Sequence, residues 1–147
     1  MNEFEQRRTV VRDYLLSEHR DLIKTVLACA DSIIESRSDT DRTVTGVPLA
    51  DGLADPLRER LDRMGIIERL PTVLIGAVGA MDASLPADPV GAPPYVVVAN
   101  TGPLMRATID SRRLVITIEV FRVHRDTRQY VRTTNDPNEA LSIEIQS

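Results

Sequence analysis

The chain has 147 residues, of which 42% are hydrophobic and 27% are charged, as in ordinary soluble proteins. This length corresponds to about one domain. The longest apolar run, residues 73–81, is half of the ~18 residues that a membrane span requires, and the charged N-terminus has no apolar signal-peptide core. We therefore expect a cytoplasmic protein that does not bind membranes.

The net charge of −4 is unevenly distributed. Residues 1–93 carry 11 basic and 16 acidic side chains, a net charge of −5, whereas residues 94–147 carry 7 and 6, a net charge of +1. Only one of the 18 basic residues is a lysine, a depletion found in proteins from GC-rich genomes and from salt-adapted organisms. The single cysteine, Cys29, excludes an internal disulfide.

Residues 3–37 are predicted to form one long helix, because apolar residues recur at steps of three, four and seven. The main row is Val11, Leu15, Leu22, Val26, Cys29 and Ile33, and a second row is Val10, Tyr14, Ile23, Leu27, Ala30 and Ile34. An unbroken helix would span about 50 Å at 1.5 Å per residue. So long a helix must cover a whole sheet or pair with a copy of itself, and we expect a homodimer to which residues 3–37 contribute.

Two further helices are predicted before a change in composition. Residues 36–47 are rich in Ser, Thr and Asp and indicate a loop. The next helix is expected to begin with Asp55 as N-cap and Pro56 at its first position and to stop at Gly65. A third helix is expected from Pro71 to about Ala83. A connector at residues 86–94 follows, with prolines at 86, 89, 93 and 94.

Residues 95–147 alternate between apolar and polar side chains, as strands do. Placing a turn at Ser111–Arg112 pairs Ile109 with Leu114, and the turn 100–103 pairs Val98 with Met105. The loop 124–127 pairs Val120 with Val131, and a last strand contains Leu141, Ile143 and Ile145. Every register puts the apolar side chains on the same face, which a slip of one residue would invert. The residues expected on the buried face are Met105, Ala107, Ile109, Leu114, Ile116, Ile118, Val120 and Val131.

The sequence therefore predicts a single α+β domain over residues 1–147. A helical N-terminal half, residues 1–85, is expected to pack on a roughly five-stranded antiparallel β-meander, residues 95–147, with the proline-rich connector between them.

Three segments resemble small uncharacterised haloarchaeal proteins. They are "APPYVVVANTGPLMRATIDSRRLVITIEVFRV" (92–123), "VLACADSII" (26–34) and "GIIERLPTVL" (65–74), in a resemblance that covers about two-thirds of the chain. None of these strings is a functional motif. The resemblance implies a lineage and a salt-rich cytoplasm, and it implies no activity.

No residues combine into a recognisable catalytic, metal or cofactor site. His19 beside Glu18 is an acid/base candidate, but neighbours at i and i+1 do not face each other on a helix. Cys29 lies about 15 Å along the helix axis from His19 and is expected to be a buried apolar residue. The segment around Gly76 and Gly79 has no phosphate-loop lysine, so these glycines favour the close packing of a helix over a nucleotide site. Asp39 and Asp41 are expected in a solvated loop. We therefore expect no catalytic residue, no metal and no cofactor.

The most informative candidate surface is the expected outer face of the sheet, where aromatic residues lie among arginines. The register places Phe121 opposite Tyr130 and Glu119 opposite Arg132. Three interpretations are open: plain cross-strand stabilisation, a protein interface, which favours Tyr, Phe and Arg, and a platform for single-stranded nucleic acid. The candidate binding residues are Arg106, Phe121, Arg128, Tyr130 and Arg132.

These features favour a non-catalytic, self-associating binding protein that uses the outer face of the sheet to bind a protein partner. A nucleic-acid-binding regulator is the first alternative, and a small enzyme without a recognisable motif is the second. Salt separates the first two, because phosphate contacts weaken steeply as salt rises.

Overall fold

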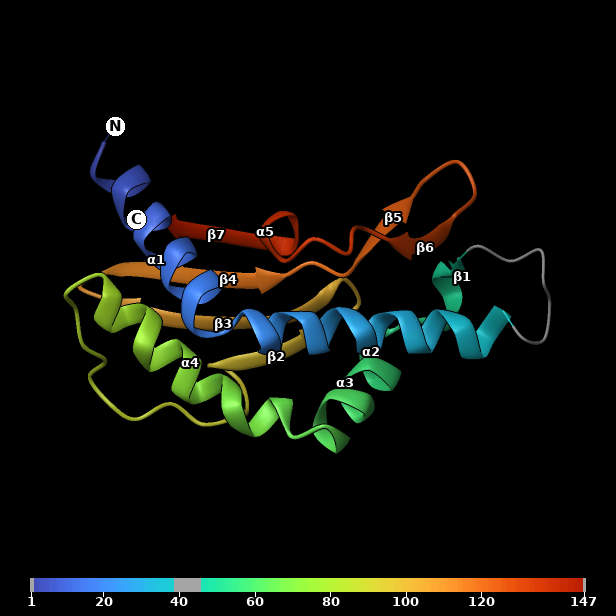
Figure 1. Cartoon of the computed structure of the whole chain (residues 1–147), viewed down its shortest axis with the longest axis horizontal. Helices are drawn as coiled ribbons and strands as arrows, with labels where there is room; N and C mark the ends of the chain where they lie inside the picture. Colours follow the sequence, from blue (N-terminus) through green and yellow to red (C-terminus); the bar gives the residue numbers. More distant parts are fainter. Residues whose placement is uncertain (1, 39–45, 147) are drawn as a thin grey trace.

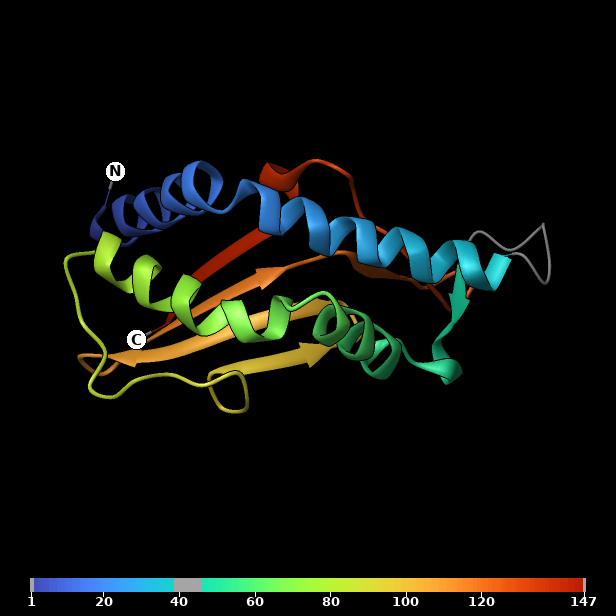
Figure 2. The same cartoon turned by 60° about the horizontal axis from the view of Figure 1, so that its bottom comes forward.

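The computed structural model describes residues 2–38 and 46–146. Helices lie on one face of a four-stranded antiparallel sheet, and a three-stranded antiparallel sheet lies beside its end (Figures 1 and 2). The predicted α+β class and the mostly helical N-terminal half are confirmed. The strands, however, divide between two sheets instead of forming one meander.

The predicted long helix is two helices, α1 (Glu3–Glu18) and α2 (Arg20–Ser38). The break lies at His19, whose φ of −131° and ψ of 25° are not helical. The two helices have largely different neighbours: α1 packs on α4 and β7, α2 packs on α3, and α5 contacts both. Both helices bury their main apolar row inside the chain, whereas Val10 of the second row is 42% exposed. The chain itself therefore covers most of the stripe on residues 3–37, and the homodimer to which these residues contribute stays a prediction.

The middle of the chain contributes more than helices. Strand β1 (Val47–Pro48) and the 3-10 turn η1 (Leu49–Asp51) precede helix α3 (Ala54–Arg63). Leu53, and not Asp55, is the N-cap of α3. Its first amides are capped from a distant hairpin, because Asn100 Oδ1 accepts from Leu53 N at 2.8 Å and from Ala54 N at 2.9 Å. The expected loop at 36–47 overlaps the end of α2, and its residues 39–45, with Asp39 and Asp41, lie outside the described residues.

Helix α4 (Ile66–Ala80) begins five residues before the predicted start, and Pro71 lies inside it. A proline within a helix deprives one carbonyl of its usual donor, here the carbonyl of Ile67. Gly91, in the connector, lies against that carbonyl so closely that a Cβ there would be 3.0 Å from the oxygen. The connector is thus packed on the helix where the proline interrupts the backbone hydrogen bonds.

The four-stranded sheet has the order β2-β3-β4-β7. Its strands are β2 (Val96–Ala99), β3 (Gly102–Ile109), β4 (Arg112–Ile118) and β7 (Leu141–Gln146), with the short helix α5 (Pro137–Ala140) before β7. The three-stranded sheet has the order β1-β6-β5, with β5 (Phe121–His124) and β6 (Gln129–Arg132). The N-terminal half therefore supplies a strand to the C-terminal part of the fold.

Each predicted hairpin register is wrong by two residues. Met105 pairs with Ile116, Val96 pairs with Met105, and Val123 pairs with Tyr130. The β3–β4 turn is formed by Asp110 and Ser111, both with positive φ, a conformation typical of tight two-residue hairpins. A shift of two residues keeps every side chain on its face. The predicted buried face is accordingly confirmed from Met105 to Val120, whereas Val131 is only half-buried.

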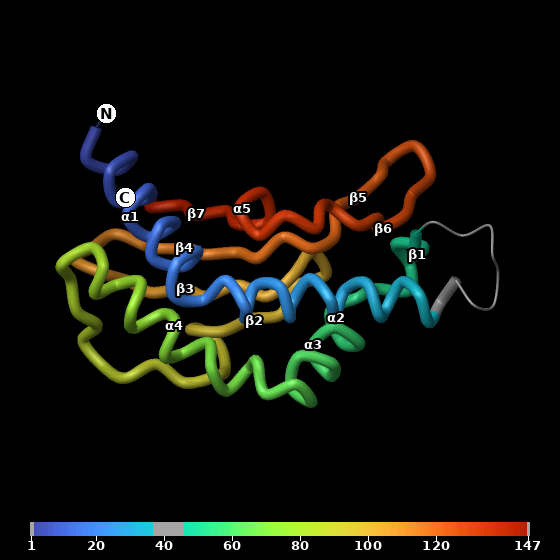
Figure 3. The backbone as a smooth tube through the Cα atoms, in the orientation of Figure 1, coloured from blue at the N-terminus to red at the C-terminus, as the bar shows by residue number. Residues whose placement is uncertain are grey.

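The alternation fails where the chain passes from β4 to β5, a path traced in Figure 3. The amides of Val120 and Phe121 both donate to the carbonyl of Thr101, at 2.8 and 3.0 Å. Two consecutive residues therefore oppose one, as in a β-bulge, and both side chains are buried. The bulge moves Phe121 from the expected outer face to the core.

Candidate functional site

The structure does not assemble the five predicted binding residues into one exposed surface. Phe121 is 1% exposed and Tyr130 is 9% exposed, so the expected exposed aromatic pair is wrong. They are not cross-strand partners either, because Phe121 pairs with Arg132 and Tyr130 with Val123. The bulge before Phe121 and the shifted hairpin register explain both errors.

Arg132 fastens helix α2 to the three-stranded sheet. Its side chain is 16% exposed and forms an ion pair with Asp31 on α2, with Nε to Oδ1 at 2.7 Å. It also donates to the carbonyls of Val120 and Thr134 and to Asn135 Oδ1. Every nitrogen of this guanidinium is hydrogen-bonded within the chain, so Arg132 has a structural role and is not part of a free binding surface.

Arg128 lies in the loop of the β5–β6 hairpin, which projects from the end of the molecule (Figure 1). Its φ of 55° is left-handed, which costs a non-glycine residue roughly 1–2 kcal/mol. Arg122, Arg125 and Arg128 are all exposed, and the acid between them is Asp126. We call residues 122–128 the arginine hairpin.

Arg106 is the predicted residue that lies on the outer face of the four-stranded sheet. The helices α1, α3 and α4 contact the strands from the other side, and no described helix covers this face (Figure 2). The outer face comprises Val97, Leu104, Arg106, Thr108, Arg113, Val115, Thr117, Ser142, Glu144 and Gln146.

The centre of the outer face is apolar. Val97 and Leu104 are cross-strand partners, and Val115 is a diagonal neighbour of Leu104, whose own partner is Thr117. We call Val97, Leu104 and Val115 the apolar patch. All three are half-buried by neighbouring side chains, although no described element packs over them. The sequence analysis identified this face, but of the five residues chosen to represent it only Arg106 lies on it, and the other four belong to the β5–β6 hairpin.

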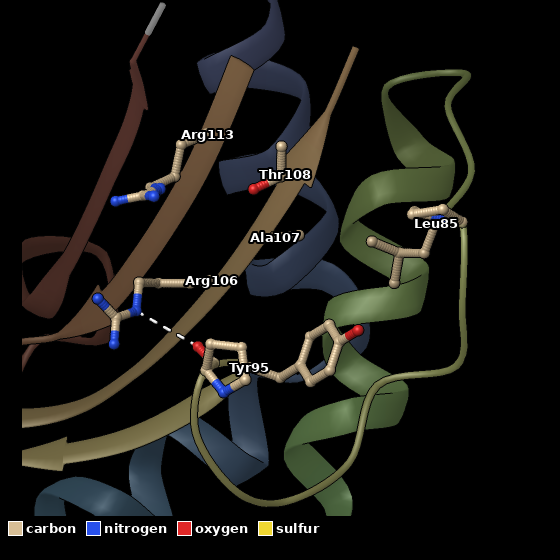
Figure 4. A pocket seen from close by; sticks show the side chains of 8 residues that line it. Leu85, Tyr95, Arg106, Ala107, Thr108 and Arg113 are labelled. Atoms are coloured by element: carbon tan, nitrogen blue, oxygen red, sulfur yellow. Dashed lines mark hydrogen bonds between the residues drawn. The ribbon is translucent and has the colours of Figure 1, made fainter. Parts of the chain in front are cut away.

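A pocket with a volume of about 240 Å³ lies at the edge of the outer face. Since Val96 pairs with Met105, β3 continues past the end of β2, and residues of the connector border that free stretch (Figure 4). We call this the edge pocket. Its lining residues are Leu85, Pro86, Pro94, Tyr95, Arg106, Ala107, Thr108 and Arg113.

The two arginines of the edge pocket point to the same side of the sheet (Figure 4). Arg106 Nε donates to the carbonyl of Pro94 at 3.3 Å, which orients its guanidinium. Arg106 pairs with Val115, so Arg113 is its diagonal neighbour, about 7–8 Å away. None of the residues that line the pocket is acidic. The pocket therefore has an electropositive side and an apolar side.

His19 occupies the break between α1 and α2, where its Nε2 lies 3.1 Å from the hydroxyl of Tyr14. Burial lowers the pKa of His19 below its ordinary value of 6.5, Arg69 lowers it further, and Glu18 opposes both. Burial, and then Glu18, raise the pKa of Tyr14. Gly76 on α4 leaves room for this pair, because a Cβ there would lie 1.7 Å from the Tyr14 hydroxyl. Tyr14 and His19 contact each other at the break between α1 and α2. Neither residue lines the two pockets that border the sheet.

The other candidates show no site geometry. Cys29 is buried, and burial raises the pKa of its thiol. Among residues 2–38 and 46–146, no three His, Cys, Asp or Glu side chains are grouped so that they could hold a metal ion. Nor is any helix in these ranges both long and apolar enough to cross a bilayer.

The fold and its surfaces define a class: an α+β protein with helices on one face of an antiparallel sheet and an uncovered opposite face. Residues 9–146 match the model of a family described as a domain of unknown function, DUF7988. The chain belongs to this family. No curated protein and no solved structure matches the chain.

Proposed function

We propose that this protein is a non-catalytic binding protein whose outer sheet face binds a protein partner. A second copy of the chain is one such partner. The observation that supports this proposal is the apolar patch on a face that no described helix covers. Apolar residues at the centre of a surface with polar residues around them are the usual composition of protein interfaces. The proposed location is cytoplasmic, and the resemblance to haloarchaeal proteins favours an interface that tolerates high salt.

The size of the face indicates how tight this association is. Four strands about 4.8 Å apart, each with about six residues at 3.3 Å, give a flat area of roughly 400 Å². A standard stable interface buries about 800 Å² on each partner. The outer face alone therefore supports reversible association, and we expect a monomer–dimer equilibrium in the micromolar range.

Sedimentation equilibrium over a range of concentrations tests this proposal. The wild-type chain should rise from 16.3 kDa towards twice that mass. Val115→Lys should remain monomeric, because a charge at the centre of the patch must be desolvated on association. Thr72→Lys, an exposed position on α4, is the matched control and should associate normally. A wild-type chain that stays at 16.3 kDa at about 200 μM would refute self-association.

The arginine hairpin supports a second candidate function, the binding of nucleic-acid phosphates. Its arginines are exposed, and so is the imidazole ring of His124 between them, whereas Phe121 and Tyr130 are buried. With one ring for base stacking, the expected contacts are mainly to the backbone. Three phosphate contacts predict a slope of log K against log salt of about −2.7, and each arginine removed should reduce it by about 0.9. Arg58→Gln, an exposed arginine on α3, should leave the slope unchanged. A slope near zero would rule this function out.

A further inference from the structure

We infer that the edge pocket binds a small organic carboxylate, held between the guanidinium groups of Arg106 and Arg113. Its apolar part would lie against Leu85 and Tyr95. This site is separate from the apolar patch, and the inference goes beyond the proposed protein-binding function.

The positive charges of the pocket favour the binding of an anion. Arg106 and Arg113 are diagonal neighbours on one face, and two like charges at that spacing repel each other unless an anion lies between them. Some arginines of the chain have a carboxylate within 4.0 Å: Arg7 binds Glu3, Arg63 binds Glu59, and Arg132 binds Asp31. Neither arginine of the edge pocket forms such an ion pair in the described part of the chain, and no acidic residue lines the pocket.

The nearest carboxylate along the sheet is that of Glu144, the cross-strand partner of Val115 and the diagonal neighbour of Arg113 on β7, two strands from Arg106. It forms no ion pair with Arg113 within 4.0 Å. Its Oε2 accepts a hydrogen bond from Gln146 Nε2 at 3.1 Å. The pair of guanidinium groups therefore keeps its donors available to a ligand.

One arginine is fixed in place before a ligand arrives. The bond from Arg106 Nε to the Pro94 carbonyl leaves the two terminal nitrogens of the guanidinium free, and Figure 4 shows them on the same side of the sheet as those of Arg113. A planar guanidinium matches the two oxygens of a carboxylate. Because Arg106 is oriented in advance, less conformational entropy is lost on binding.

The opposite wall of the pocket indicates what the carboxylate is attached to. Leu85, Pro86, Pro94 and Tyr95 offer apolar surface, and Figure 4 shows the ring of Tyr95 directed towards Leu85. A volume of about 240 Å³ is below the ~300–1,000 Å³ of pockets that hold drug-sized ligands. A single ring or a short branched chain bearing one carboxylate therefore fits the pocket. Two arginines can bind a phosphate dianion as well as a carboxylate, so it is the apolar wall that favours an organic carboxylate.

Titration of the ¹⁵N-labelled full chain with benzoate, followed by NMR, tests this site. We expect saturable shifts centred on the amides of Thr108 and Arg113, with a dissociation constant of about 1 mM, as for a ligand of this size. Benzamide, which has the same shape without the charge, should produce no saturable shifts. Arg113→Gln and Arg106→Gln should each weaken benzoate binding at least about tenfold, because each removes a charge-assisted hydrogen bond.

Arg58→Gln is the matched control, because it removes one exposed arginine from α3, outside both the edge pocket and the arginine hairpin, and it should bind benzoate as the wild type does. The spectrum of each variant without ligand reports whether its fold is retained. Equal binding of benzoate and benzamide, unchanged binding in the folded Arg113→Gln variant, or saturation by inorganic phosphate but not by benzoate would each overturn the inference. Sedimentation of Arg113→Gln separates this site from the apolar patch, since association should persist when benzoate binding is lost.

Discussion

Replacing Phe121 by alanine is expected to destabilise the fold by about 4 kcal/mol. An aromatic side chain buries about 150–250 Å², and at about 25 cal/mol per Å² its burial contributes about 4–6 kcal/mol. Measured Phe→Ala losses in cores are about 3–5 kcal/mol. The cavity cannot collapse easily, because the Phe121 amide is bonded to Thr101 and its cross-strand partner Arg132 is bonded to Asp31.

Urea denaturation followed by circular dichroism measures this loss. Val123→Ala is the matched control: it lies on the same strand, two residues along, and is 43% exposed, so its loss should be below about 1 kcal/mol. If Phe121 only fastened two strands on an exposed face, its truncation would cost about 0.2–1 kcal/mol. A Phe121→Ala variant within about 1 kcal/mol of the wild type would therefore refute its assignment to the core.

Three further predictions concern the stability of the fold. Gly102→Ala should prevent normal folding, because a Cβ there would lie 1.9 Å from the Ile118 carbonyl oxygen and φ is 151°; a soluble variant with wild-type melting temperature would contradict this. Arg132→Met should cost about 2–3 kcal/mol in urea denaturation, as the loss of a charged hydrogen-bonded group does, whereas Arg63→Gln, in an exposed pair, should cost under about 0.5 kcal/mol. The pKa of His19 is lowered on folding, so its neutral form stabilises the fold above pH 6.5, and that stability is lost as the pH falls below 6.5 through the folded pKa. His19→Gln should therefore flatten the fall in stability that the wild type shows between pH 7 and 5.5. Identical pH profiles of the variant and the wild type would refute this role of His19.

The strand faces could be predicted from the sequence, whereas the junctions between elements could not. Alternation alone places Met105, Ile116 and Ile118 in the core, and it survives a register error of two residues because the period of a strand is two. The bulge at Val120–Phe121 depends on the carbonyl of Thr101, some twenty positions away, and no local pattern encodes that contact. A single break in alternation was enough to move the predicted aromatic pair from one face to the other.

The helix break is a second case in which tertiary contacts decide the local structure. The apolar row from Val11 to Ile33 continues through His19 without a gap, and no proline or glycine marks the break. The break coincides with a change of packing partners, from α4 and β7 for α1 to α3 for α2. The edge pocket was equally unpredictable, because its lining combines Leu85, just before the connector, with Arg106 and Arg113 from two strands, and the spacing of these residues follows no motif.

The position of β1 has a consequence for the order in which the molecule folds. Val47 pairs with Tyr130, so the three-stranded sheet joins segments that are 83 positions apart, whereas the β5–β6 hairpin is closed by a short loop. Contacts between distant segments form late, because the entropy of loop closure must be lost before they contribute. The hairpin therefore has to be present before β1 can dock, and the edge formed by β6 stays open until the N-terminal half has folded. Until β1 docks, β6 keeps an unpaired edge, which makes it the segment where association between incompletely folded copies would begin.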